Sequence, residues 1–218
     1  CLSLFLKKFK IEPDDFLKYG VEGVMMIDKQ IARKKWDELV KTIEGGGITY
    51  IRKYGRTGEA TQLYFDMYKV LFPDLIVKKD HSNKSPKKSL FELLNVGEVK
   101  NYQASHVFGH TCNVFCFMAP WNIVLMPKIY DPLTGHEAKG NLRDKFIAIL
   151  RKRIFSEFGD MIIEYNHSME KYAPVISNHF ESLVPQSSDD KNIKKELAQI
   201  ERFKQSILKN FKLIKEEE

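Results

Sequence analysis

The stretch KNYQASHVFGH at residues 100–110, with WNIVLMPK at 121–128 and GHEAKG at 135–140, decides the predicted fold of this chain. Short apolar and β-branched runs separated by glycine, proline and polar residues are typical of strands joined by loops. The pattern predicts a strand that ends at His106, a loop, a second strand opened by Asn122, and a third polar position at His136. His, Asn and His therefore follow one another along a predicted strand-loop-strand-helix unit.

This order of residues, with the segments SHVFG at 105–109 and APWNIV at 119–124, resembles the His-Me finger, or HNH, nucleases. Over residues 98–150 the chain is most similar to HNH segments of bacterial restriction-type endonucleases. The resemblance implies an α+β protein with a central ββα-metal finger flanked by helices. It implies that His106 is the general base, that Asn122 binds the metal or the scissile phosphate, and that His136 helps to hold the metal. Ser105 stands where the superfamily often carries an acidic or histidine ligand.

The chemistry of phosphodiester hydrolysis explains these residue types. The attacking water must lose a proton, and an imidazole has a reference pKa of about 6.5, close to the working pH. The leaving oxygen gains charge in the transition state, which a hard divalent cation can stabilise. The resemblance therefore implies Mg²⁺ or Mn²⁺ as cofactor and double-stranded DNA as partner.

The charge distribution favours a polyanionic partner near the same segment. The chain carries 35 basic and 29 acidic residues, for a net charge of +6. Basic residues gather at a glycine-punctuated turn at 52–58 and in the run at 141–155, which follows His136. Lys and Arg side chains contact phosphates in nucleic-acid complexes. The predicted phosphate contacts are Arg52, Lys53, Arg56, Lys139 and Arg143.

Other classes of protein are disfavoured by composition. No apolar run approaches the roughly 18 to 20 residues that span a bilayer, so we expect a soluble, cytoplasmic protein without membrane contact. Three cysteines cannot form a disulfide framework. Cys112 and Cys116 lack a second ligand pair at zinc-finger spacing, so we expect them to be apolar fillers.

The chain divides into three predicted regions. These are a helical N-terminal region at 1–88, the ββα-metal nuclease region at 89–185, and a linker with a C-terminal amphipathic helix at 186–218. The predicted elements are helices at 13–43, 59–72, 141–158 and 191–215, a strand at 48–51, and a polar loop at 78–88. Isoleucines recur every seven residues in the last helix, from 193 to 214. We expect this helix to pack on its own domain, with a homodimer contact as the alternative.

Alternative functions stay open at this point. Asp74, Glu98 and Lys100 match the skeleton of a PD-(D/E)xK nuclease, in which two carboxylates bind Mg²⁺ and the lysine activates water. A non-catalytic DNA-binding protein would keep the finger as a scaffold. A metal-free hydrolase would use Cys112 or Cys116 as nucleophile with His110 as base.

Overall fold

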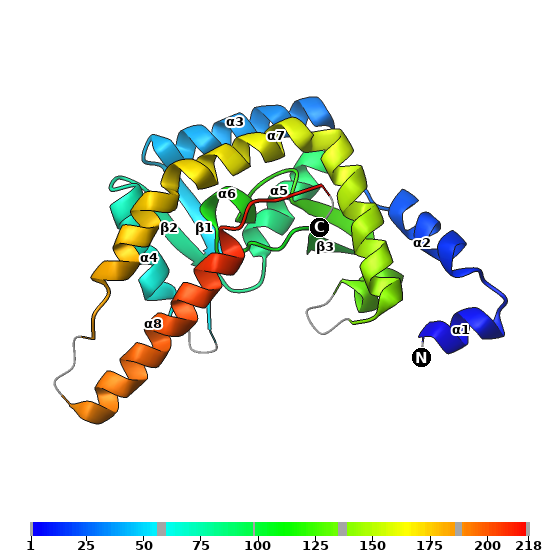
Figure 1. Cartoon of the computed structure of the whole chain (residues 1–218). Helices are drawn as coiled ribbons and strands as arrows, with labels where there is room; N and C mark the ends of the chain where they lie inside the picture. Colours follow the sequence, from blue (N-terminus) through cyan, green and yellow to red (C-terminus); the bar gives the residue numbers. More distant parts are fainter. Residues whose placement is uncertain (1, 56–59, 98, 135–138, 186–188, 217–218) are drawn as a thin grey trace.

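The computed structural model describes residues 2–55, 60–97, 99–134, 139–185 and 189–216, and it confirms the α+β class (Figure 1). The strands are β1 (Ile48–Arg52), β2 (Ile76–Asp80), β3 (Tyr102–His106) and β4 (Ile123–Pro127). The helices are α1 (Leu2–Lys8), α2 (Pro13–Glu22), α3 (Lys29–Glu44), α4 (Thr61–Leu71), α5 (Lys84–Leu94), α6 (Val114–Phe117), the 3-10 helix η1 (Lys128–Leu133), α7 (Asn141–Ser182) and α8 (Asp190–Asn210).

The strands form two small sheets. Strands β1 and β2 are parallel, whereas β3 and β4 are antiparallel, with His106 opposite Ile123. The free edge of β4 is covered by Met25, which exchanges two backbone hydrogen bonds with Leu125. The predicted strand at 48–51, the strand ending at His106 and the strand following Asn122 are therefore confirmed.

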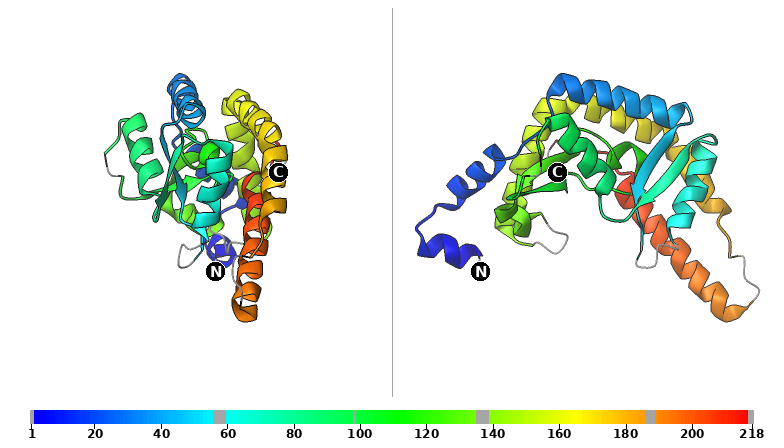
Figure 2. Two further views of the ribbon diagram at one scale, coloured as in Figure 1. Left: turned by 90° about the vertical axis from the view of Figure 1, so that its left-hand side faces the viewer. Right: turned by 180° about the vertical axis from the view of Figure 1, so that it is seen from behind.

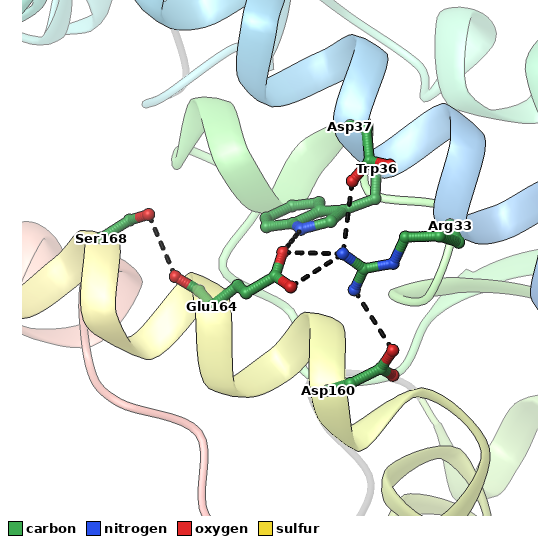
Figure 3. Close-up of polar contacts among 6 residues, drawn as sticks. All are labelled: Arg33, Trp36, Asp37, Asp160, Glu164 and Ser168. Carbon is green, nitrogen blue, oxygen red and sulfur yellow. Dashed lines mark hydrogen bonds and ion pairs between the residues drawn. The ribbon is translucent and has the colours of Figure 1, made fainter.

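Helices α3 and α7 run side by side along one face of the molecule (Figures 1 and 2). Arg33 on α3 joins them, because its Nη1 donates to Glu164 at 2.7 Å and its Nη2 donates to Asp160 at 3.3 Å. The indole N–H of Trp36 donates to the same Glu164 carboxylate at 2.8 Å (Figure 3). Hydrogen bonds to charged groups are stronger than neutral ones, so this cluster fixes the packing of the two helices.

Two predictions about the N-terminal half are wrong. The single helix predicted at 13–43 is two helices, because α2 ends at Glu22 and α3 begins after Asp28, whose carboxylate accepts from the backbone N–H of Gln30. The stretch predicted as a loop at 78–88 contains the end of β2 and the start of α5. Local hydrogen bonds explain this difference, because the Asp80 carboxylate accepts backbone N–H groups from the turn before α5 and from its first residues.

Helix α7 is longer than the helix predicted at 141–158. Its backbone departs from helical angles at Phe158, where the prediction ended, and helical geometry then resumes to Ser182. Helix α8 confirms the helix predicted at 191–215, but it begins one residue earlier, at Asp190, and ends five residues earlier, at Asn210. It packs on its own domain through its second half, where Phe203 and Ile207 are buried.

One cluster of buried side chains forms the core. It draws on all three predicted regions, as Leu17, Trp121 and Phe203 illustrate, and α5 spans the predicted boundary at residue 88. None of the helices in the described part of the chain has the length and apolar character needed to cross a membrane.

Candidate functional site

His106 ends β3 and is partly buried beside helix α6. Its Nε2 lies 3.0 Å from the carbonyl oxygen of Phe117, and its ring stacks on the Phe117 ring at an interplanar angle of 14°. A backbone carbonyl can only accept a hydrogen bond, so Nε2 carries the proton. The neutral ring therefore has its lone pair on Nδ1, which is the nitrogen that can act as a base.

The surroundings keep this imidazole neutral. Burial lowers the pKa of His106 to about 4, the hydrogen bond with Phe117 opposes that shift, and the charge of Arg52 adds to it. Asp80 acts in the opposite direction. At neutral pH the side chain is therefore in the form that accepts a proton. A phosphate bound nearby would raise its pKa toward the working pH, because a negative charge favours the imidazolium.

Asn122 is fully buried and holds the loop between β3 and β4. Its Oδ1 accepts the backbone N–H of Phe108 at 2.9 Å, and its Nδ2 donates to the carbonyls of Gly109 and Cys116, both at 3.0 Å. All these partners lie in the segment that follows His106. The geometry makes Asn122 a positioning residue, because its amide atoms already bind the loop.

The same loop is tied to distant elements. The Tyr68 hydroxyl donates to the carbonyl of Cys112 at 2.7 Å and accepts the N–H of Val114 at 3.1 Å. Asn210, at the end of α8, accepts the N–H of Cys112 at 3.0 Å, and its own carbonyl accepts from Asn113 at 3.0 Å. These buried bonds fix the loop and the C-terminal end of α8 as one unit.

Strand β1 ends against this loop. The N–H of Arg52 donates to the carbonyl of Thr111 at 2.8 Å, and the N–H of Lys53 donates to the carbonyl of Asp80 at 2.8 Å. Arg52, a predicted phosphate contact, is thus brought next to the loop that follows His106, and Lys53, a second one, is tied to the end of β2.

A cleft of about 790 Å³ lies over this arrangement. His106 and the loop after it line the cleft, together with the end of β1, the first turns of α7 and the second half of α8. Among the described residues that line it, one is acidic, Glu201, and six are basic: Arg52, Lys53, Arg143, Arg151, Arg202 and Lys209. Such a balance attracts an anionic ligand to the place where His106 lies.

The predicted site residues fall into three groups. Arg52, Lys53 and Arg143 line the cleft with His106. Lys139 does not line it; it borders a neighbouring hollow between α1 and the start of α7, which Arg143 also lines. Arg56 and His136 lie outside the described residues.

Three basic residues of the cleft were not predicted. Arg151 belongs to the basic run at 141–155 and is eight residues from Arg143, a spacing that puts both on one helix face. Arg202 and Lys209 are seven residues apart on α8. The spacing in the sequence signals that each pair shares a face, but only the packing of the helices turns both faces toward His106.

The cysteines are not suited to nucleophilic catalysis. Cys112 and Cys116 are buried free thiols, as expected of apolar fillers. Burial raises the pKa of the Cys112 thiol to about 11 and that of Cys116 further, so both thiols stay protonated at neutral pH. His110, the base of that alternative, has its Nδ1 3.1 Å from the hydroxyl of Tyr165.

Two of the three PD-(D/E)xK residues, Asp74 and Lys100, lie beside different sheets. Asp74 precedes β2, and its side chain lies against Gly46 before β1. Lys100 precedes β3 in the other sheet, where its carbonyl accepts from Lys128. Glu98 lies outside the described residues.

Comparison with known proteins identifies a family. The family model described as "Uncharacterised protein PM1201" matches residues 27–216. The chain is 39% identical over 183 residues to the uncharacterized protein PM1201 of Pasteurella multocida (strain Pm70), a match that covers 81% of this chain and 82% of that protein. No solved structure matches the chain.

Proposed function

The chain belongs to the family described as uncharacterised protein PM1201, and we propose that it is a metal-dependent endonuclease that hydrolyses DNA phosphodiester bonds, of the HNH and restriction type. The observation that carries the proposal is the position of His106. A neutral imidazole with its proton fixed on Nε2 lines a cleft whose described wall has six basic side chains and one acidic side chain. A base and an anion-binding surface are the two components that water attack on a phosphodiester requires.

In the proposed reaction, Nδ1 of His106 takes a proton from water as its oxygen attacks the phosphorus. The bond from phosphorus to the leaving oxygen then breaks, the electron pair stays on that oxygen, and the oxygen takes a proton from a solvent water. The resulting imidazolium keeps the hydrogen bond from Nε2 to the Phe117 carbonyl. Arg52 and Arg143, which line the same cleft, would hold the non-bridging oxygens and neighbouring phosphates.

The donor set for Mg²⁺ or Mn²⁺ is incomplete among the described residues. Within the part of the chain that the structure describes, no three His, Cys, Asp or Glu side chains are grouped as a metal site. Asn122, one predicted ligand, already binds the loop, and His136, the other, lies outside the described residues. The metal and the ββα-metal finger remain part of the proposal, and no step above passes through the ion.

Cleavage of supercoiled plasmid tests the proposal. We expect nicked and linear products with Mg²⁺ or Mn²⁺, none with a chelator, and none from His106→Ala. The basic cleft also suits a second candidate, a DNA-binding protein without catalysis. That candidate predicts metal-independent binding and intact plasmid under every condition, and this result would contradict the nuclease.

A further inference from the structure

Helix α8 is packed on the protein along only part of its length. Its buried residues are Phe203, Ser206, Ile207 and Asn210, all in the second half. Every residue at 190–199 is at least partly exposed, and Leu197 is 49% exposed. Figures 1 and 2 show this first half extending beyond the body of the molecule. A projecting half-helix gains little stability from packing, and its side chains remain exposed to solvent.

A basic stripe runs the length of this helix. The cleft is lined by Arg202, Gln205 and Lys209, which are three and four residues apart and so share one face. Continued toward the N-terminus with the same spacing, this face carries Ala198, Lys195 and Lys191. Lys191 and Lys195 are exposed. We define the basic stripe as Lys191, Lys195, Arg202 and Lys209.

The dimensions of the stripe suit a nucleic-acid backbone. From Lys191 to Lys209 is 18 residues, or about 27 Å at about 1.5 Å per residue. Duplex DNA advances about 3.4 Å per base pair, so the stripe matches about eight base pairs. The stripe begins in the cleft and leaves it in one direction.

We propose that the outer part of the basic stripe, Lys191 and Lys195, binds the phosphate backbone of duplex DNA outside the cleft. The proposal rests on the proposed function, because it places the substrate in the cleft and extends it along α8. The part beyond the cleft runs from Arg202, which lines the cleft, to Lys191, or about 16 Å at about 1.5 Å per residue. The site then prefers DNA that continues about five base pairs beyond the cleft on that side.

Charge decides between DNA and a second copy of the chain. Two copies joined through this face would bring the lysines of one stripe against those of the other, which is repulsive. The opposite face of α8 carries Ile193, Ile200 and Ile207, and it turns toward the body where Ile207 is buried. A dimer would therefore use the apolar face and leave the stripe exposed.

The test measures metal-free binding of fluorescent duplexes of about 10 and about 30 base pairs as salt is varied. The variant is Lys191→Ala with Lys195→Ala. The matched control is Lys34→Ala with Lys41→Ala on α3, which removes the same charge from exposed positions on another face. Alanine is a strong helix former, so both variants should keep the parent circular dichroism spectrum.

For the long duplex, we expect the stripe variant to lower the salt slope of log K by about 1.8, since two phosphate contacts are lost. The control variant should keep the parent slope. The short duplex should show a smaller loss, because about 10 base pairs reach the outer lysines in only some of the bound positions. Equal slopes for the two double variants on long DNA would overturn the stripe. A changed sedimentation coefficient in the stripe variant alone, with parent DNA binding, would also overturn it in favour of a second copy.

The readouts separate the two proposals. A stripe variant that keeps the parent salt slope while plasmid cleavage persists overturns the stripe alone. If the stripe variant lowers the salt slope but the parent protein cuts no plasmid, the stripe proposal stands and the nuclease proposal is overturned.

Discussion

The Nε2 atom of His106 lies 3.0 Å from the carbonyl oxygen of Phe117, and this bond fixes which ring nitrogen can accept a proton. His106 ends β3, whereas Phe117 belongs to α6, eleven residues further along the chain. The short helix thereby orients the imidazole without using a charged partner. A neutral, oriented histidine in a basic cleft is the centre of the proposed mechanism.

The titration of His106 should be displaced to low pH. Burial holds its pKa at about 4, and Arg52 contributes to the depression. The folded protein therefore binds fewer protons here than the unfolded chain between about pH 4 and about 6.5, so stability falls as the pH drops through this window. We expect the ring resonances of His106 to titrate near pH 4 by NMR and to move upward in Arg52→Ala. An ordinary midpoint in the parent would contradict the burial of the ring.

Asn122→Ala should destabilise the protein by about 2 to 4 kcal/mol, because it leaves the N–H of Phe108 and two carbonyls without their partner. The measurement is urea unfolding with a chelator present. Ser105→Ala, a change at a partly exposed position of the same unit, serves as control and should cost less. Unchanged metal-free stability of Asn122→Ala would return this residue to the role of metal ligand.

Arg52→Ala and Arg143→Ala should weaken binding to all DNA sequences and lower the salt slope by about 0.9 each, as loss of one phosphate contact does. Lys34→Ala, on the exposed face of α3, is the matched control. An unaltered slope in both arginine variants would assign these residues to the solvated surface.

The thiols should be inert while the protein is folded. Since burial raises the pKa of Cys112 to about 11, iodoacetamide should leave it unmodified at neutral pH, and Cys112→Ser should retain cleavage. Rapid alkylation of Cys112 with loss of activity would instead support the hydrolase that uses a cysteine nucleophile.

The strands around the site could be predicted from local pattern. Ile48–Arg52 lies between Gly47 and Lys53, Tyr102–His106 follows the polar Asn101, and both contain β-branched or aromatic side chains. The break before α3 and the helix after Asp80 were missed for one reason. In both places an aspartate carboxylate accepts backbone N–H groups and starts a helix. The spacing of apolar residues, on which the prediction relied, does not reveal such a bond.

Only part of the candidate site could be predicted from the sequence. His106 was predicted as the base from its motif, but its neighbours come from tertiary packing. Arg52 reaches the site because its N–H donates to Thr111, and Arg202 does so because α8 is anchored by the bonds of Asn210. The resemblance to HNH nucleases predicted that Asn122 binds the metal or the scissile phosphate. Its hydrogen bonds to the loop could not be predicted from sequence, and its role as a ligand stays a prediction.

The most direct test compares cleavage rates of four proteins under single-turnover conditions with Mg²⁺ or Mn²⁺: the parent, His106→Ala, Asp74→Ala and Lys100→Ala. We expect His106→Ala to lower the cleavage rate roughly 10² to 10⁴-fold, the usual contribution of a general base, and to leave DNA binding nearly intact. Asp74→Ala and Lys100→Ala should cut at close to the parent rate. If those two variants abolish cleavage while His106→Ala cuts normally, the histidine mechanism is wrong and the carboxylate-lysine site replaces it.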